Sequence, residues 1–196
     1  MLKIGVLVSG GGTNLQAIID ATNKNIINAD IKVVLSNKEN AYGLERARTN
    51  NIEAIYEKNE DRIIEILEDR EIDLVVLAGY LKIISLKFVD KFRNKIINIH
   101  PSLIPAFCGE GYYGERVHQG VIDYGAKVSG ATVHFVDEGA DTGAIIMQET
   151  VMVDDNDDST TLAKKVLEIE HKILVESIKL FCENKIDING RKVSIK

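Results

Sequence analysis

The chain has 196 residues, of which 45% are hydrophobic and 28% are charged, and its formal net charge at pH 7 is −6. These values suit a globular domain with a sizeable core, and they exclude a disordered, collagen-like or low-complexity chain. A nucleic-acid-binding protein normally carries a basic stripe, which an acidic balance does not suggest. We therefore expect no nucleic-acid partner, whereas a small anion held by backbone N–H groups is compatible with this composition.

The cysteine content and the N-terminus bear on the compartment. Cys108 and Cys182 are too few for a disulfide scaffold and lack metal-ligand spacing. The apolar residues at 1–8 are too short a run for a signal peptide, so they are predicted to form a buried strand. No run approaches the ~18 apolar residues of a membrane span. We expect a cytoplasmic protein that binds neither a metal nor a membrane.

The first hundred residues alternate between strand-like and helix-like segments. Short apolar runs predict strands over residues 4–8, 31–35, 52–56, 74–79 and 96–99. Apolar residues at helical spacing predict helices over residues 13–21, 42–50, 63–67 and 86–92. Alternation of this kind indicates βαβ units and hence a parallel sheet with right-handed crossovers.

The pattern changes after His100. An irregular loop over residues 100–116 contains both prolines, and a short helix is predicted over 116–124. Strands predicted over 128–136 and 144–153 are joined by so short a connection that an antiparallel pair is expected. Ser159 is expected to cap a long helix over 160–182, and the acidic run 154–158 to form a solvated turn before it. A hairpin turn is predicted at residues 188–191. The fold class is therefore α/β, with a mostly parallel central sheet, helices on both faces and an antiparallel extension in the C-terminal half.

Residues 9–15, Ser-Gly-Gly-Gly-Thr-Asn-Leu, follow the first predicted strand and open the first predicted helix. Glycines let the backbone approach a ligand closely, and a helix N-terminus supplies unpaired N–H groups that suit a phosphate. The segment is neither a Gly-x-Gly-x-x-Gly motif nor a P-loop, so a single phosphate is favoured over a dinucleotide. The alternative is an ordinary turn between strand and helix.

Asn98 and His100 end the strand predicted over 96–99, and alternation along a strand places both on one face. Ligands of parallel sheets bind at the carboxyl ends of the strands. An amide can stabilise an oxyanion and an imidazole can move a proton, which suits acyl-type chemistry. A carboxylate from the acidic loop 137–143, such as Asp141, could orient His100, although that loop taken alone also fits a solvated turn.

Four segments taken together resemble those of one enzyme family. The first is residues 9–15, the loop just described, and the second is residues 77–80, Leu-Ala-Gly-Tyr. The third is residues 98–105, Asn-Ile-His-Pro-Ser-Leu-Ile-Pro, and the fourth is residues 133–143, which begin with Val-His-Phe-Val and end with Asp-Thr-Gly. From about residue 3 to 181 the chain is similar to the phosphoribosylglycinamide formyltransferases, folate-dependent enzymes of purine synthesis. The resemblance implies a Rossmann-like formyltransferase fold. It also implies transfer of a formyl group from 10-formyltetrahydrofolate to the amino group of glycinamide ribonucleotide, without a metal.

The resemblance further implies roles for individual residues. The catalytic Asn, His and Asp of the family match Asn98, His100 and Asp141. Its ribonucleotide-binding residues match Gly12, Thr13, Asn14 and Glu170. Its folate contacts match Arg62, Leu81, Lys82, Ile83, Ile84, Asn98, Asp137 and Ala140.

In the implied mechanism the amine adds to the formyl carbon, and Asn98 with protonated His100 meets the oxyanion. Asp141 is expected to raise the pKa of His100 by favouring the imidazolium. The loop after Pro105 departs from the family, because it is several residues longer and has Arg116 in place of one loop histidine, while His118 is retained. We expect this departure to alter how the loop closes over substrate.

Other enzyme types share the Asn-x-His and Asp pattern, namely methionyl-tRNA formyltransferase and formyltetrahydrofolate deformylase. Each usually carries a further domain, for which this chain is too short. A non-catalytic nucleotide-binding module is a third alternative, and the presence of Asn98, His100 and Asp141 argues against it. We expect a single domain over residues 1–196, with a ribonucleotide-binding half at about 1–100 and a folate-binding half at about 101–196. We expect it to act as a monomer or homodimer on small-molecule substrates.

Overall fold

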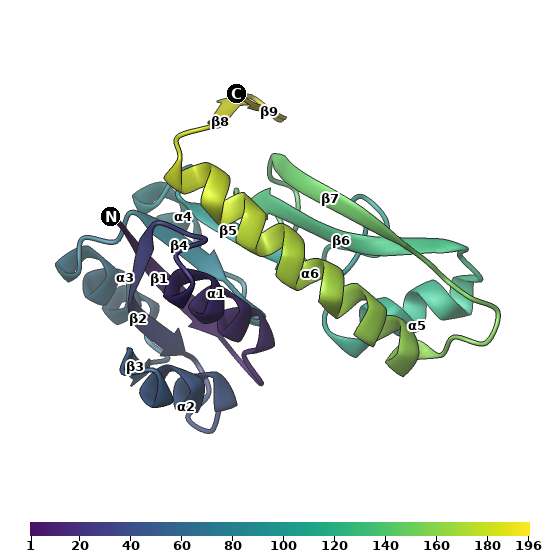
Figure 1. Cartoon of the computed structure of the whole chain (residues 1–196), viewed down its shortest axis with the longest axis horizontal. Coiled ribbons are helices and arrows are strands. Elements are labelled where there is room, and N and C mark those ends of the chain that lie inside the picture. The colour runs from purple at the N-terminus through teal and green to yellow at the C-terminus, as the bar shows by residue number, and fades with distance from the viewer.

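The structure is a computed structural model that describes all residues, 1–196, and its centre is a seven-stranded sheet. The parallel strands are β1 (Leu2–Val8), β2 (Ala29–Ser36), β3 (Glu53–Tyr56), β4 (Leu74–Leu77) and β5 (Ile96–His100). The antiparallel strands are β6 (Val128–Phe135) and β7 (Ile145–Met152). In space the order is β3-β2-β1-β4-β5-β6-β7 (Figure 1). The predicted fold class is confirmed.

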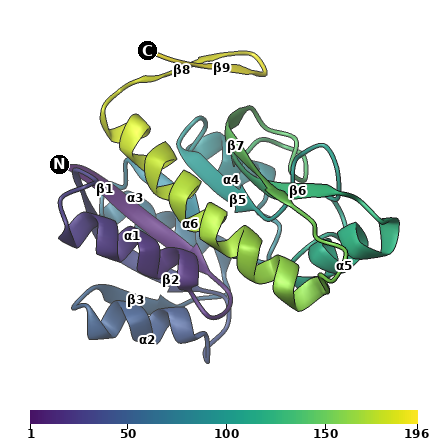
Figure 2. The same cartoon turned by 45° about the vertical axis from the view of Figure 1, so that its right-hand side comes forward.

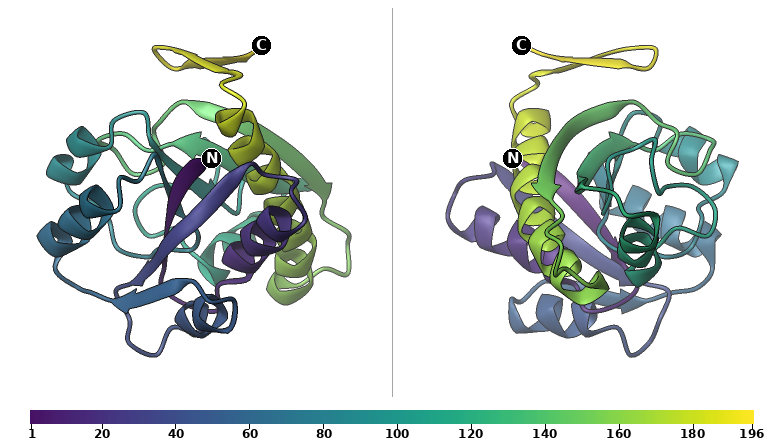
Figure 3. Two further views of the ribbon diagram at one scale, coloured as in Figure 1. Left: turned by 60° about the vertical axis from the view of Figure 1, so that its left-hand side comes forward. Right: turned by 90° about the vertical axis from the view of Figure 1, so that its right-hand side faces the viewer.

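Helices cover both faces of the sheet (Figure 3). One face packs against α1 (Thr13–Asn23), α2 (Tyr42–Thr49), α5 (Glu115–Tyr124) and α6 (Ser159–Cys182). The other packs against α3 (Glu60–Asp69) and α4 (Leu86–Lys91). Strand alternation divides the core accordingly, since Val6 and Val8 of β1 join the first cluster and Leu7 joins the second. None of the helices combines the length and apolar character that crossing a membrane requires.

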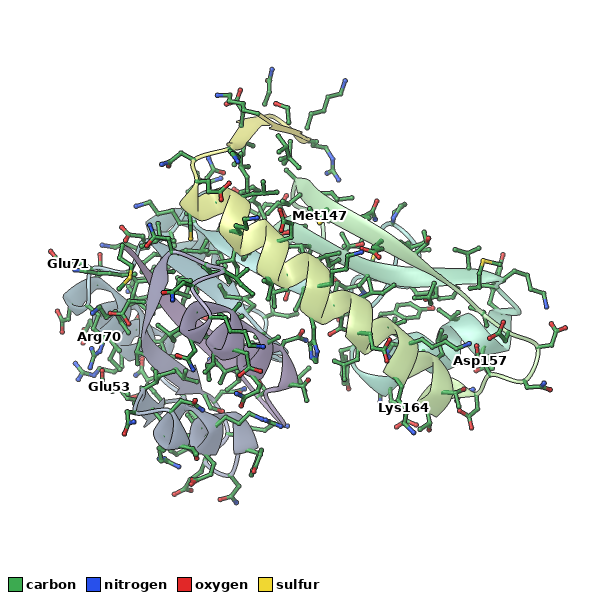
Figure 4. All side chains as sticks on the ribbon, in the orientation of Figure 1. Glu53, Arg70, Glu71, Met147, Asp157 and Lys164 are labelled. Carbon is green, nitrogen blue, oxygen red and sulfur yellow. The ribbon has the colours of Figure 1, made fainter.

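The start of α6 differs by one residue from the sequence prediction. Asp158, not Ser159, is the N-cap: its carboxylate accepts from the Thr161 N–H at 2.7 Å, and the Thr161 hydroxyl accepts from the Asp158 N–H at 2.9 Å. A carboxylate at this position also benefits from the positive end of the helix dipole, which a hydroxyl does not. The neighbouring Asp157, labelled in Figure 4, holds Lys165 at 2.6 Å, so the acidic run stabilises the helix start.

The chain ends in a hairpin of β8 (Ile186–Asn189) and β9 (Lys192–Ile195), which confirms the predicted turn. The hairpin extends beyond the C-terminal end of α6 (Figures 1 and 2). Its apolar side chains Ile186, Ile188 and Val193 pack against the larger core cluster, which anchors it to the domain.

The strand order determines where a ligand can bind. β1 lies between β2 and β4, so the chain leaves the centre of the sheet in one direction after β1 and in the other after β4. A crevice forms where strand order reverses in this way, outside the carboxyl ends of the strands. The loops that follow β1, β4 and β5 meet at this edge.

Candidate active site

A cavity of about 480 Å³ lies at the carboxyl ends of β1, β4 and β5. Its walls come from the segments after β4 and β5, the loop between β6 and β7, and single residues of α1 and α6. Among the lining residues are Asn14, Asn98, His100, Asp141 and Glu170. Residues that are far apart in the sequence, from both of its halves, therefore border one space.

Asn98 and His100 lie on the same face of β5 and both line the cavity. Ile99 between them belongs to the hydrophobic core, as the alternation of a strand requires. His100 is almost fully buried, with 5% of its surface exposed. The strand therefore presents an amide and an imidazole side by side at its end.

Asp141, which lies in the loop between β6 and β7, contacts two histidines. Its carboxylate lies 3.5 Å from Nδ1 of His100 and 3.5 Å from Nε2 of His134, and it accepts the N–H of Gly109 at 2.9 Å. Asp141 has a positive φ of 58°, a conformation that Asp adopts more readily than most residues with a Cβ. The loop therefore holds this carboxylate within reach of both imidazoles.

His134 is the functional residue that sequence reasoning missed. It stands opposite Asn98 in the antiparallel register of β5 and β6, and its Nε2 lies 3.1 Å from Nδ2 of Asn98. Its Nδ1 lies 2.7 Å from the carbonyl oxygen of Phe135, so Nδ1 carries the proton and Nε2 accepts from the amide. This bond fixes which end of the Asn98 side chain is the donor and leaves the second N–H of Nδ2 free. No signal within the sequence of either strand marks His134, because its role depends on the pairing that places it opposite Asn98.

The second nitrogen of His100 is also held. Its Nε2 lies 3.0 Å from the carbonyl oxygen of Phe107, which has no proton to donate. The imidazole therefore carries a proton on Nε2, and Nδ1, which faces Asp141, is the nitrogen that gains or loses a proton.

The burial of His100 corrects the expectation that its imidazole is protonated before the reaction. Burial lowers the pKa of His100 below its ordinary value, because it outweighs the opposing influence of Asp141 and of the Phe107 carbonyl. Asp141 therefore does raise the pKa, but not enough to keep the resting imidazole charged at neutral pH. For Asp141 itself burial acts to raise the pKa, while His134, His100 and the Gly109 N–H together lower it below its ordinary value. The pair is accordingly a neutral imidazole beside a carboxylate.

The glycine loop between β1 and α1 is held from behind by α2. The carbonyl of Gly10 accepts from the Gly43 N–H at 3.0 Å, and that of Gly11 accepts from Nε of Arg46 at 2.7 Å. The N–H groups of residues 11–14 have no hydrogen-bond partner within the protein. Gly12 has a φ of +69°, and a Cβ there would lie 2.7 Å from Cα of Gly43. The loop therefore presents free backbone donors at a helix N-terminus, the arrangement that holds a phosphate.

Asn14 and Glu170 form a buried pair between α1 and α6. Nδ2 of Asn14 donates to Oε2 of Glu170 at 2.6 Å, while Oδ1 of Asn14 is buried without a partner. Burial raises the pKa of Glu170 to about 7, although the bond from Asn14 acts against this. The pair thus places a buried carboxyl group and an unpartnered amide oxygen beside the glycine loop.

Most of the other residues expected from the resemblance also border the cavity. Leu81, Lys82, Ile83, Ile84, Asp137 and Ala140 line it. Gly12 and Thr13 lie beside its wall rather than in it, next to Asn14. Arg62 is not brought to the site: it lies on the exposed face of α3, paired with Glu65 one turn away.

The loop after Pro105 closes one side of the cavity. Residues 109–114 line it together with His118, whose Nδ1 is buried without a partner. Phe107 packs edge to face against Tyr112 and Tyr124. Arg116 is not among the lining residues and stacks on Tyr113, at 5.0 Å from the ring centre. No group of three or more His, Cys, Asp or Glu side chains is placed to hold a metal ion.

The fold and the site place this chain in a known class of proteins. It belongs to the formyl transferase family, whose model matches residues 2–178. A solved structure titled glycinamide ribonucleotide transformylase 1, from Symbiobacterium toebii, superimposes with a TM-score of 0.94 at 41% identity, covering 100% of this chain and 94% of that one.

Sequence relatives point to one branch of this family. A protein named phosphoribosylglycinamide formyltransferase from Haemophilus influenzae is 43% identical over 195 residues, which cover 95% of this chain and 90% of that protein. A relative named phosphoribosylglycinamide formyltransferase, chloroplastic, from Vigna unguiculata is 44% identical over 193 residues. This chain spans 62% of the Vigna protein's length. The predicted resemblance to the phosphoribosylglycinamide formyltransferases is confirmed.

Proposed function

We propose that this chain transfers a formyl group from 10-formyltetrahydrofolate to the amino group of glycinamide ribonucleotide, within purine synthesis. One observation supports this most: a single cavity contains both the cluster of Asn98, His100 and Asp141 and the pair of Asn14 and Glu170 beside free loop N–H groups. The first set suits chemistry at a carbonyl carbon, and the second suits a phosphorylated sugar. Formyl transfer between two bound molecules requires both in one place.

Asn98 is the group that stabilises developing negative charge in this proposal. When an amine adds to the formyl carbon, the formyl oxygen becomes an oxyanion. The free N–H of Asn98 Nδ2 donates to that oxygen, while its other N–H is held by His134 at 3.1 Å. Because the amide is fixed before the reaction, little reorganisation is needed as charge develops.

His100 moves the proton that the reaction displaces. The attacking nitrogen becomes an ammonium, and its proton must reach the departing nitrogen of the folate. A neutral imidazole takes that proton on Nδ1, with Nε2 held by the Phe107 carbonyl, and then delivers it. Asp141, 3.5 Å from Nδ1, stabilises the imidazolium while it exists.

The folate supplies the formyl carbon and a leaving nitrogen, and the cavity wall formed by the segment after β4 and the loop between β6 and β7 would hold it. Leu81, Ile83 and Ile84 offer apolar surface there, and the loop over residues 137–141 offers peptide groups. Such a wall fits a flat heteroaromatic ring with polar edges. We expect the ribonucleotide to bind through Gly12, Thr13, Asn14 and Glu170.

A comparison of formyl acceptors tests the proposal. Purified protein is given a formyl-folate analogue together with glycinamide ribonucleotide, methionyl-tRNA or water alone. We expect rapid transfer to the ribonucleotide, with rates for the other two acceptors lower by orders of magnitude. Release of formate without an acceptor would favour a deformylase, and formyl-methionyl-tRNA would favour that second transferase. The absence of all three activities would favour a non-catalytic nucleotide-binding module.

The proposal also covers the binding partners of the protein and its cellular compartment. We propose that its partners are these two small molecules and that it works in the cytoplasm, because its two cysteines, Cys108 and Cys182, are both free. Sedimentation of the purified chain distinguishes a monomer from a homodimer.

A further inference from the structure

The backbone of the segment after β4 is held by one side chain, while Tyr80 and Ile84 of the segment pack against the smaller core cluster. Residues 80–84 line the cavity but belong to no helix or strand. Within this segment the only backbone hydrogen bond is that of the Leu81 N–H, which donates to Oγ of Ser9 at 2.9 Å. Just before it, the carbonyl of Gly79 accepts from the Ser9 N–H at 3.0 Å. Ser9 therefore makes both of the polar contacts that hold the start of this segment.

The hydroxyl of Ser9 is oriented by a second residue. Ser9 is 2% exposed, and its hydroxyl donates to Oδ1 of Asn37 at 2.7 Å. A hydroxyl has one proton, so donation to Asn37 leaves its lone pairs to accept from Leu81. Asn37 follows the end of β2, and the chain of contacts thus joins the ends of β2, β1 and β4.

Ser9 also begins the glycine loop. The residue directly precedes Gly10, whose carbonyl is held by α2, and the loop continues to the free N–H groups of residues 11–14. One buried hydroxyl therefore connects the loop on the ribonucleotide side to the segment on the folate side.

We propose that Ser9 and Asn37 form a positioning pair that holds residues 80–84 against the cavity, in a fixed relation to the glycine loop. The proposal rests on the proposed function, because it assigns this segment to the folate side. Ser9 does not touch the reacting atoms. Loss of its hydroxyl frees the Leu81 N–H and lets the segment move, while Asn98, His100 and the loop N–H groups stay in place.

Hydrogen–deuterium exchange of the ligand-free protein tests whether Ser9 holds this segment in place. In Ser9→Ala, the amide of Leu81 is expected to exchange several-fold faster than in the parent, since its only hydrogen bond is lost, whereas the unbonded amides of residues 82–84 exchange fast in both proteins. Ser36→Ala is the matched control. Ser36 is also fully buried at a strand end, but its hydroxyl bonds only the backbone of Lys38, at 2.9 and 3.0 Å. Unchanged exchange in Ser9→Ala, or an equal change in Ser36→Ala, overturns the proposal.

Binding measurements test whether this positioning matters for folate binding. Ser9→Ala is expected to weaken binding of a folate analogue by about 3- to 10-fold, the loss of roughly one hydrogen bond. Ribonucleotide affinity is expected to stay within about twofold, so KM for the folate rises more than kcat falls. Asn37→Asp keeps the acceptor oxygen and is expected to retain folate affinity, whereas Asn37→Ala loses part of it. Should Ser9→Ala fold poorly, the Asn37 variants decide the matter alone.

The two proposals fail in different ways. Equal weakening of both ligands in Ser9→Ala would mean general damage and would overturn the positioning pair. A parent protein that neither binds a folate nor transfers a formyl group would overturn the proposed function. The exchange experiment would still show whether Ser9 holds the segment, because it needs no ligand.

Discussion

The carboxylate of Asp141 lies 3.5 Å from Nδ1 of His100, yet the imidazole is not kept protonated by it. Burial lowers the pKa of His100 and outweighs the opposing effect of Asp141. An imidazole that is neutral at rest and becomes charged only when it takes a proton matches the requirement of formyl transfer. The carboxylate then acts on the charged form, which exists during the reaction.

Asp141→Asn keeps the size of the side chain and removes its charge. Because Asp141 raises the pKa of His100, its loss is expected to lower that pKa further. The acidic limb of the pH–rate profile should therefore move to lower pH, and kcat should fall on the order of 10²-fold, with ribonucleotide affinity nearly unchanged. A steady-state pH profile of both proteins checks this, and a shift of the limb to higher pH would contradict it.

A double-mutant cycle tests whether the two residues act together. His100→Ala is expected to reduce kcat about as much as Asp141→Asn does. The double variant should lose much less than the product of the two separate effects, since removal of the imidazole leaves the carboxylate nothing to stabilise. Turnover of all four proteins is the measurement, and multiplicative losses would mean that Asp141 and His100 work independently.

Gly12→Ala is expected to destabilise the protein and weaken ribonucleotide binding. The φ of +69° costs a residue with a Cβ about 1–2 kcal/mol, and the Cβ would approach Cα of Gly43 to 2.7 Å. Gly11→Ala is the control, because a Cβ there meets nothing within 4 Å. Urea unfolding should separate the two variants by about 2 kcal/mol. Calorimetry should show lower ribonucleotide affinity for Gly12→Ala with folate affinity kept; equal stability of both variants would count against this geometry.

Most of the fold could be predicted from the sequence because its elements have strong periodic signals. The run at 74–77 is apolar throughout, and the structure buries all four residues of β4. Alternation placed Asn98 and His100 on one face of β5, where the structure has them. Local signals of this kind need no knowledge of the partners of a strand.

What could not be predicted depends on contacts between distant segments. The role of His134 follows from its register opposite Asn98, which nothing within either strand specifies. The lowered pKa of His100 depends on burial by residues from several elements. Arg62 was assigned by similarity, but its place on α3 points it to Glu65 and solvent. Asp158 rather than Ser159 caps α6, and the local sequence does not separate the two, since both residue types are good caps.

His134→Ala is expected to lower kcat on the order of 10²-fold, comparable to the loss of an oxyanion donor, and to change KM for either substrate little. The imidazole fixes the Asn98 amide through the 3.1 Å contact, and without it the amide can turn its carbonyl toward the oxyanion. His134→Gln offers an acceptor again and should recover part of the loss. His171→Ala, at a histidine outside the cavity, is the control. Comparable losses in His134→Ala and His171→Ala would indicate general damage instead.

Glu170 is expected to make stability depend on pH, and Glu170→Gln to remove this dependence. Burial raises the pKa of Glu170 from 4.5 to about 7 in the folded protein. Between these values the folded protein keeps the proton and the unfolded chain releases it, so the free energy of unfolding falls as pH rises. The decrease between about pH 4.5 and 7 should be on the order of 3 kcal/mol. Gln keeps an oxygen to accept from Asn14 but cannot ionise.

Urea unfolding at several pH values between 5 and 8 measures this effect. Relative to the parent, Glu170→Gln should gain stability steadily as pH rises toward 7 and change little above it, because the parent then carries a buried charge in full. Glu168→Gln is the matched control, since Glu168 lies on the exposed side of α6 and its replacement should leave the slope unaltered. If the slope persists in Glu170→Gln, the buried carboxyl is not its source. In that case the Asn14–Glu170 pair holds its charge at neutral pH, and a ribose hydroxyl would meet a carboxylate there.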